Sequence, residues 1–207
     1  KTPERIGGKT RYQTSEDIYK KFFTSRAVPT AFVATGRDFP DALSSASAGA
    51  ALGAPVLLVN GKSDTSLSTY LVGSLKDKKA SRILISGGPG AVNKTIQANL
   101  AKSFTVERLG GADRYATNAA VNSYVAKQAG SVDLTSVWVV TGRDFPDALS
   151  ATAPSGKLSS RLVLSNGSCI PKPVVSSWLT APGSKVSNVY LAGGTSVLKK
   201  SVADLTE

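Results

Sequence analysis

Short apolar runs recur along the first half of the chain. They are Thr30 to Thr35, Pro55 to Val59, Arg82 to Ser86 and Phe104 to Arg108. Each run is rich in β-branched or aliphatic residues, and three of them lead into glycine, which is typical of strands buried on both faces. The pattern therefore predicts four β-strands in this half.

The segments between these runs carry apolar residues at three- and four-residue spacing, as in Leu67, Leu71 and Leu75, which indicates amphipathic helices. The predicted helices are Ser15 to Ser25, Asp41 to Leu52, Ser66 to Leu75 and Asn93 to Ala101. Strands that alternate with helices form right-handed βαβ units. We therefore expect an α/β fold of three-layer units, each with a mainly parallel sheet between helices.

An internal repeat organises the whole chain. The ten residues Thr35 to Ser44 recur unchanged as Thr141 to Ser150, at an offset of 106 residues, and Arg5 to Tyr12 matches Arg108 to Tyr115 at an offset of 103. A period near 100 residues is the size of a small domain. The sequence therefore predicts a tandem duplication with two domains, residues 1–104 and 105–207.

The composition removes several kinds of chemistry. The chain has no histidine and no methionine, and Cys169 is its single cysteine. Intramolecular disulfides, Cys/His zinc sites and Ser-His-Asp triads are thereby excluded. So few oxidisable sulfurs suit an extracellular location. No apolar run approaches the ~20 residues that a membrane-spanning helix needs, so no membrane partner is expected.

The chain is strongly basic. Lys and Arg number 25 against 14 Asp and Glu, which gives a formal net charge of +11. Such an excess attracts nucleic acid, acidic glycans or phosphate-rich wall polymers, although a merely solvated basic surface is the alternative. Trp138 falls in a predicted buried strand and Trp178 in a predicted helix, which leaves no aromatic ladder to stack on bases. Nucleic acid is therefore the least favoured of these partners.

The repeated decapeptide contains Asp-Phe-Pro-Asp at the start of a predicted helix. Asp38 can cap this helix while Asp41, three residues on, bonds back to the N–H of the cap. A carboxylate pair or a metal site is the alternative, but no third ligand lies nearby in sequence. We interpret the following residues as a structural motif: Phe39, Pro40, Asp41, Phe145, Pro146 and Asp147.

Glycine-rich turns follow the third predicted strand of each repeat, at Gly87-Gly88-Pro89-Gly90 and at Gly193-Gly194. Backbone amides at a strand-to-helix turn can bind an anion. A tight turn that requires positive φ is the structural alternative. Neither turn has the Walker lysine or the GxGxxG spacing, so a nucleotide is not indicated.

The loops after parallel strands meet at the carboxyl edge of the sheet. We therefore expect one basic rim formed by Arg37, Asp38, Asn60, Gly87, Gly88 and Arg108. Arg11-Tyr12 and Arg114-Tyr115 each set a cation beside an aromatic ring, as sugar-phosphate ligands favour, although a packed Tyr with a paired Arg is the alternative. The candidate ligand-binding residues are Arg5, Arg11, Tyr12, Arg37, Gly87, Gly88, Arg108, Arg114, Tyr115, Arg143, Gly193 and Gly194.

These blocks resemble the cell-wall-binding repeat 2 family of Gram-positive surface proteins and autolysins. The resemblance rests on Arg11-Tyr12, Thr35 to Ser44, Ile83 to Ile85 and Gly87-Gly88, together with their counterparts in the second repeat. It implies a Toprim-like or flavodoxin-like fold for each repeat. It also implies a secreted, non-catalytic module at the cell wall or cell surface that anchors a surface protein or autolysin to an anionic polymer, either teichoic-acid-like or an acidic polysaccharide.

The resemblance also bears on assembly and on alternatives. Family members commonly carry three repeats, and this chain ends at Glu207, where a third would begin, so we expect a longer parent or a homo-oligomer to cover the exposed surfaces. A Toprim-type phosphotransfer site needs an Asp-x-Asp pair, and none occurs. No catalytic residue, metal or cofactor is therefore expected. The alternative function is an adhesin-type module that binds host glycans or another polyanion.

Overall fold

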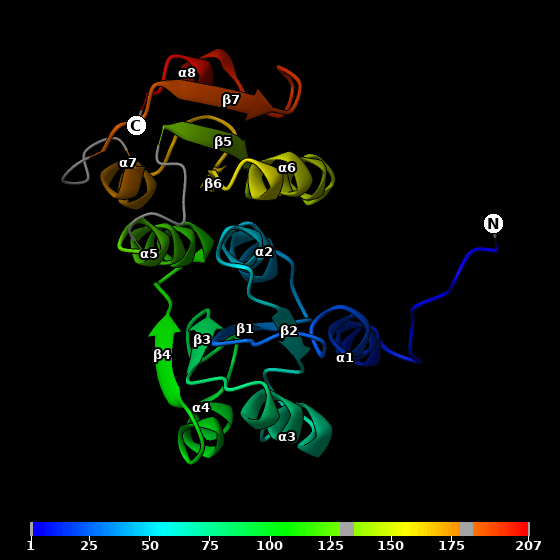
Figure 1. The fold of residues 1–207 in the computed structure, drawn as a ribbon. Helices are drawn as coiled ribbons and strands as arrows, with labels where there is room; N and C mark the ends of the chain where they lie inside the picture. The colour runs from blue at the N-terminus through cyan, green and yellow to red at the C-terminus, as the bar shows by residue number, and fades with distance from the viewer. Residues whose placement is uncertain (1, 129–134, 179–183, 207) are drawn as a thin grey trace.

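A computed structural model describes residues 2–128, 135–178 and 184–206, which form two parallel β-sheets (Figure 1). The strand order is β2-β1-β3-β4 in the first sheet and β6-β5-β7 in the second. The strands are β1 Thr30–Thr35, β2 Val56–Val59, β3 Arg82–Ser86, β4 Thr105–Leu109, β5 Ser136–Thr141, β6 Arg161–Ser165 and β7 Asn188–Ala192. The four strands predicted for the first half are confirmed to within one residue at either end.

Helices alternate with the strands, as predicted. They are α1 Arg11–Phe22, α2 Pro40–Leu52, α3 Thr69–Asp77, α4 Lys94–Ala101, α5 Arg114–Ala126, α6 Pro146–Lys157, α7 Lys172–Trp178 and α8 Lys200–Ala203. The first helix begins at Arg11 and not at Ser15, because Thr10 Oγ1 accepts a hydrogen bond from the N–H of Gln13 at 3.3 Å. None of the described helices combines the length and apolar character that a bilayer span requires.

The two sheets belong to similar α/β units that pack through shared helices. In the first unit α3 and α4 cover one face of the sheet, while α2 and α5 cover the other. In the second unit α7 and α8 cover one face, and α6 together with α2 covers the other. Helices α2 and α5 therefore lie between the two sheets (Figure 1).

Helix α5 joins the units, because its polar side chains bond to both. Asn118 is fully buried, and its amide group donates to Ser44 Oγ at 2.9 Å and to Leu162 O at 3.0 Å. Asn118 Oδ1 accepts from the N–H of Leu164 at 3.1 Å. In the first unit Ser15 of α1 makes the equivalent bonds to the outer strand, to Val56 O at 3.2 Å and from Leu58 N at 3.1 Å.

Strand β4 completes the first sheet, because it pairs with β3 from Arg82–Thr105 to Ser86–Leu109. Its residues follow the repeat boundary predicted after residue 104. The predicted domain boundary after residue 104 stays a prediction. The hydrogen-bonded sheet of the first unit extends beyond it, to Leu109.

Helices α2 and α6, which both begin with Pro-Asp-Ala-Leu, pack closely through small residues. We call them the hallmark helices. Ser155 Oγ donates to Ser47 Oγ at 3.1 Å, and a Cβ on Gly156 would lie 2.6 Å from Ala50 Cβ. Only small side chains permit such an approach, so these positions determine the contact between the units.

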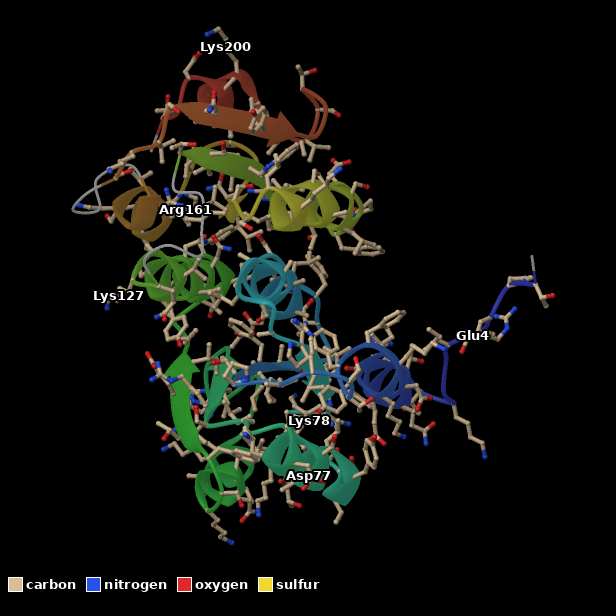
Figure 2. The ribbon with its side chains drawn as sticks, viewed as in Figure 1. Glu4, Asp77, Lys78, Lys127, Arg161 and Lys200 are labelled. Carbon is tan, nitrogen blue, oxygen red and sulfur yellow. The ribbon has the colours of Figure 1, made fainter. Side chains whose placement is uncertain are left out.

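Basic side chains are spread over several faces of the molecule. Figure 2 shows Lys78 at the end of α3, Lys127 at the end of α5 and Lys200 at the start of α8 in well-separated places. The charge of +11 is therefore distributed over more than one surface, and a ligand site must be identified by shape as well as by charge.

Candidate functional site

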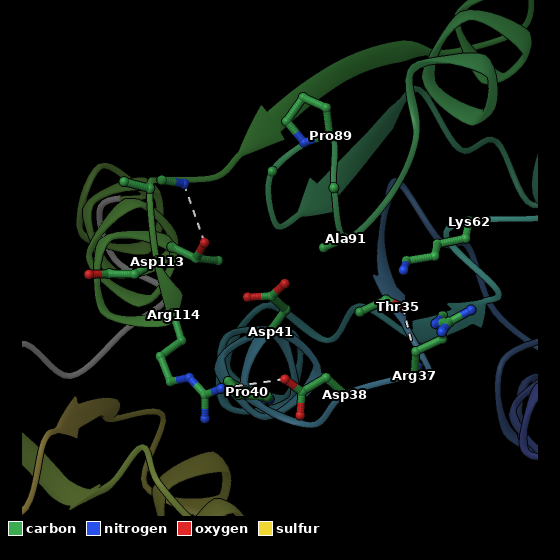
Figure 3. A pocket seen from close by; sticks show the side chains of 15 residues that line it. Thr35, Arg37, Asp38, Pro40, Asp41, Lys62, Pro89, Ala91, Asp113 and Arg114 are labelled. Atoms are coloured by element: carbon green, nitrogen blue, oxygen red, sulfur yellow. Dashed lines mark hydrogen bonds and ion pairs between the residues drawn. The ribbon is translucent and has the colours of Figure 1, made fainter.

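A cavity of about 660 Å³ lies at the carboxyl edge of the first sheet. It opens where β1 and β3 end, and these neighbours are the strands between which the connections reverse direction across the sheet. Parallel α/β sheets bind their ligands at such a switch point. The charged side chains that line the cavity are Arg37, Asp38, Asp41, Lys62, Asp113 and Arg114 (Figure 3).

The cavity is built from both units. The loops after β1, β2 and β3 bring Arg37, Lys62 and the Gly88–Ala91 turn from the first unit. Asp113 and Arg114 belong to the start of α5, where Asp113 Oδ1 accepts from the N–H of Ala116 at 2.8 Å and caps the helix. The cavity therefore requires the packing of α5 against the first sheet.

Asp41 lies in the middle of the cavity, on the first turn of α2 (Figure 3). Its carboxyl group packs on Gly87, where φ is 107° and a Cβ would collide with Asp41 Oδ2. Among the described residues, none donates a hydrogen bond to this carboxyl group. Burial and the nearby charge of Asp38 raise the pKa of Asp41 from 3.8 to about 6, although Arg114 acts to lower it.

The predicted capping box is wrong. Helix α2 begins at Pro40, its N-cap is Phe39 in a helical conformation, and no side chain caps it. Asp38 Oδ1 instead accepts from the N–H of Phe39 at 2.9 Å, so it stabilises the turn before the helix. Pro40 supplies no N–H, and this places the helix start one residue after the position that Asp38 could cap.

Two cationic side chains form one side of the cavity. Arg37 and Lys62 are exposed, and the turn that carries Arg37 is fixed by a hydrogen bond from its N–H to Thr35 Oγ1 at 3.2 Å. Arg37 was predicted from the sequence. Lys62 was not predicted, because the expected rim ended at Asn60 directly after the strand. The only signal of Lys62 in the sequence is its position three residues after β2.

The Arg-Tyr pairs have a structural geometry that is the same in both units. Arg11 Nη1 donates to Gly36 O at 2.6 Å, and Arg114 Nη1 donates to Gly142 O at 2.6 Å. The rings of Tyr12 and Tyr115 lie against Gly36 and Gly142, where a Cβ would approach them to 2.6 and 2.8 Å. Each pair therefore fixes the loop that follows the first strand of its unit.

Arg114 has further contacts in the cavity. Its Nη2 lies 3.5 Å from Asp38 Oδ2, and its guanidinium group lies over the Phe39 ring at 5.6 Å. The ion pair is partly exposed, so it contributes little energy. It nevertheless connects a carboxylate of the first unit to a cation of the second at the wall of the cavity.

The structure separates Arg108 and Arg5, which the repeat aligns. Arg108 Nε donates to Gln97 Oε1 at 2.9 Å and Nη1 donates to Gly87 O at 2.7 Å, so it supports the glycine turn beneath Asp41. Its buried Nη2 has no hydrogen-bond partner, and burial lowers the pKa of this guanidinium group. Arg5 is exposed in the N-terminal segment beside α1, away from the cavity.

The second unit repeats part of this arrangement. Arg143 and Asp144 are exposed after β5, and a Cβ on Gly193, where φ is 143°, would lie 3.1 Å from Asp147 Oδ2. Gly194 follows in the same turn. Within the described residues β7 is an edge strand, so this unit has no counterpart of β4 and α5 to complete a cavity.

A metal site does not emerge from the described part of the chain, in which no three His, Cys, Asp or Glu side chains come together. Asp38, Asp41 and Asp113 line the same cavity, but Asp38 Oδ1 and Asp113 Oδ1 accept backbone hydrogen bonds. The cavity is thus a mixed-charge site, with cations on one side and the half-buried carboxyl group of Asp41 in its middle.

Comparison with protein families agrees with the internal repeat. The sequence model of the family described as cell wall binding domain 2 (CWB2) matches residues 5–97 and 108–203. The two matched segments correspond to the two repeats and together include most of the chain.

Two proteins from Bacillus subtilis (strain 168) are similar to this chain in sequence. The N-acetylmuramoyl-L-alanine amidase LytC is 27% identical over 206 residues, which are 97% of this chain and 37% of the amidase. A protein named amidase enhancer is 28% identical over 173 residues, 81% of this chain and 21% of that protein. The chain therefore spans well under half the length of either relative.

Two solved structures share the fold. Cwp6 from Clostridium difficile superposes with a TM-score of 0.80 at 20% identity, over 97% of this chain and 31% of that one. Cwp8 from the same organism superposes with a TM-score of 0.78 at 25% identity, over 98% of this chain and 33% of that one. The arrangement of two parallel-sheet units therefore recurs in larger proteins.

Proposed function

The chain belongs to the cell wall binding domain 2 family, and from this premise we propose that it anchors a longer protein to anionic polymers of a bacterial wall. It is a cell-wall-binding module of two tandem repeats, and the family and its relatives imply a location at the cell wall or cell surface. We also propose that the chain is secreted, that the polymer is anionic, and that the anchored protein is an autolysin or another surface protein.

One observation carries the proposal, namely the cavity at the switch point of the first sheet with Arg37 and Lys62 at its side. The cavity as a whole has three cationic and three acidic side chains, so it attracts an anionic group on the side formed by Arg37 and Lys62. The net charge of +11 adds a long-range attraction for any polyanion. An anionic group of a polymer therefore fits the Arg37 and Lys62 side of the cavity, and the net charge of the chain favours its approach.

We propose that the exposed predicted residues contact the polymer and that the bonded ones position them. The proposed contacts are Arg5, Arg37, Arg143 and the amides of Gly88 and Gly194, with Lys62 added to the predicted set. The proposed positioning residues are Arg11, Tyr12, Arg108, Arg114 and Tyr115, because hydrogen bonds or ring contacts hold each of them against a loop. Gly87 and Gly193 permit the turns on which Asp41 and Asp147 lie.

We further propose that this chain contributes binding and no catalysis. Histidine is absent from the sequence, and among the described residues that line the cavity no hydroxyl group is hydrogen-bonded to a carboxylate. The amidase relative is much longer than the matched segment, which leaves room for its activity outside the region of similarity. A hydrolysis assay of the isolated chain on purified walls tests this, since release of wall fragments would contradict it.

Within the α/β class, we propose a flavodoxin-like or Toprim-like label for each unit. The order β2-β1-β3-β4 of the first sheet supports it, because the flavodoxin-like order begins 2-1-3-4. The second sheet has the same order for its three strands, β6-β5-β7. A search that places each unit separately among known α/β folds would test the label.

An apolar groove of about 810 Å³ supports association with a further unit. It lies between α1, α2 and α6 and exposes Ile18 and Leu149. In the second unit the corresponding surface is filled, because Leu43 of α2 packs against Leu162 and Leu164. We propose that a hallmark helix of another unit, from a further repeat or a second chain, fills the open groove.

Co-sedimentation of the purified chain with isolated walls tests the proposed function. We expect retention on intact walls and its loss after the anionic polymers are removed. Equal retention on stripped walls would contradict an anionic ligand. Stronger retention on host glycans than on walls would favour the adhesin-type alternative.

A further inference from the structure

The cavity at the carboxyl edge of the first sheet, which we call the junction cavity because both units line it, carries different charges on its two sides. This difference restricts the chemistry of its ligand. Arg37 and Lys62 lie on one side of Asp41, and Asp113 and Arg114 lie on the other (Figure 3). Asp38 adds a negative charge beside Arg114. The first side therefore suits a phosphate or carboxylate, whereas the middle of the cavity repels one.

The middle of the cavity lacks hydrogen-bond donors for Asp41. The described residues supply no donor to its carboxyl group, and the half-buried side chain packs against Gly87. A carboxyl group that loses part of its hydration and gains no donor from the protein can take donors from a ligand. Sugar and polyol hydroxyls are uncharged donors, and a carboxylate with two oxygens can accept two of them.

We propose that Asp41 accepts hydrogen bonds from a hydroxyl-bearing sugar or polyol unit while the adjacent anionic group of the same polymer lies between Arg37 and Lys62. This inference rests on the proposed function and names the ligand class as a polyol phosphate or glycosyl phosphate segment. Asp41 is then the residue that distinguishes such a polymer from a polyanion without hydroxyl groups.

Binding of such a ligand should change the protonation of Asp41. Hydroxyl donors stabilise the ionised carboxylate, so a bound ligand of this class should lower the pKa of Asp41 from its free value of about 6. The charged groups that face Asp41 are Asp38 on the loop before α2, Arg37 and Lys62 across the cavity, and Asp113 and Arg114 at the start of α5. A ligand whose phosphate contacted Asp41 directly would raise this pKa instead.

The chain provides its own control. Asp147 occupies the same place in the second repeat and lies on Gly193 as Asp41 lies on Gly87. It has no counterpart of α5 beside it in the described structure. If the role depends on the sequence motif alone, replacing either aspartate should change ligand binding. If it depends on the junction cavity, only replacement of Asp41 should do so.

The experiment compares a glycerol phosphate oligomer with a linear polyphosphate of the same number of phosphates, by calorimetry on the full chain at one ionic strength. We expect the glycerol phosphate oligomer to bind about tenfold more tightly, the size of one hydrogen bond to a charged group. Asp41→Ala should remove this preference, and Asp147→Ala should keep it. Failure of the wild-type chain to prefer the hydroxyl-bearing oligomer, or an equal effect of both variants, overturns the inference.

Carbon-detected NMR of the Asp41 carboxyl group gives a readout that needs no variant. We expect its pKa to fall when the glycerol phosphate oligomer saturates the wild-type chain, and an unchanged or raised pKa overturns the inference. Wall co-sedimentation distinguishes a failure of the hydroxyl subsite from a failure of the proposed wall-binding function. If the chain binds walls without these effects, only the hydroxyl subsite fails, and if it does not bind walls, the proposed function fails.

Discussion

Replacement of Asn118 by alanine should destabilise the whole chain, because this side chain bonds to both units from a fully buried position. The variant removes the acceptor of the Leu164 N–H and the donor to Ser44 Oγ, and both groups stay buried. Leu162 O keeps one partner, the amide of Asn122 at 3.1 Å. An unsatisfied buried polar group costs about 1–3 kcal/mol, so we expect a loss of about 2–4 kcal/mol.

The repeat supplies a variant that separates the two contributions. Ser15 occupies the equivalent place on α1 and satisfies both edge groups of β2 with one hydroxyl. Asn118→Ser should therefore restore the bond to Leu164 N–H while the bond to Ser44 across the junction stays lost. We expect it to recover at least half of the stability that Asn118→Ala loses.

Guanidinium unfolding with linear extrapolation measures these differences. Lys127→Ala, at the exposed end of the same helix, serves as the control and should change the free energy of unfolding by less than about 0.5 kcal/mol. A loss below about 1 kcal/mol for Asn118→Ala, or no advantage of serine over alanine, would refute the reasoning.

Three further predictions follow from the site and its surroundings. The folded-state pKa of Asp41 lies above 3.8, so its contribution to stability is present at low pH and is lost as pH rises through about 6. Asp41→Asn should therefore raise the free energy of unfolding at pH 7 by up to about 3 kcal/mol. Denaturant titrations at pH 4 and 7 measure this, and a lower free energy of unfolding for the variant than for the wild type at pH 7 would contradict it. Arg37→Ala should weaken wall binding and flatten its salt dependence, whereas Lys76→Ala, on the exposed end of α3, should not; equal losses in co-sedimentation across a salt series would remove Arg37 from the site. Leu149 is 58% exposed in the apolar groove, so Leu149→Asp should abolish concentration-dependent association in analytical ultracentrifugation. A wild-type chain that stays monomeric would exclude a second chain as the occupant, and association that Leu149→Asp leaves unchanged would contradict the groove proposal.

The strands and their order of appearance could be read from the sequence because the buried runs are apolar throughout and end at glycine. The second unit could be predicted as well, because its sequence repeats that of the first. Helix starts were harder, since Thr10 and Asp113 cap their helices through one side-chain bond each, and such bonds have no periodic signal. The capping box failed for the same reason, because a plausible pair of aspartates did not reveal that Pro40 begins the helix.

The candidate site was partly predictable. The topological rule placed Arg37 and Gly88 at the carboxyl edge, where they line the cavity. It did not reveal that Arg108 turns inward to hold Gly87 O, because a strand residue at the edge can point to either side. Nor did it reveal Asp113 as part of the same cavity, since this requires the packing of α5, a helix of the second repeat, on the first sheet.

The bonds of Ser15 and Asn118 to the outer strands also bear on solubility. Edge strands expose unpaired N–H and C=O groups that can template pairing with another chain, and this is a route to aggregation. Leu58 N–H and Val56 O on β2, and Leu164 N–H and Leu162 O on β6, already have side-chain partners from the adjacent helix. Strand addition is therefore hindered at these positions of β2 and β6, and the other outer strands, β4 in the first sheet and β7 in the second, are left as the edges open to backbone pairing in the described structure.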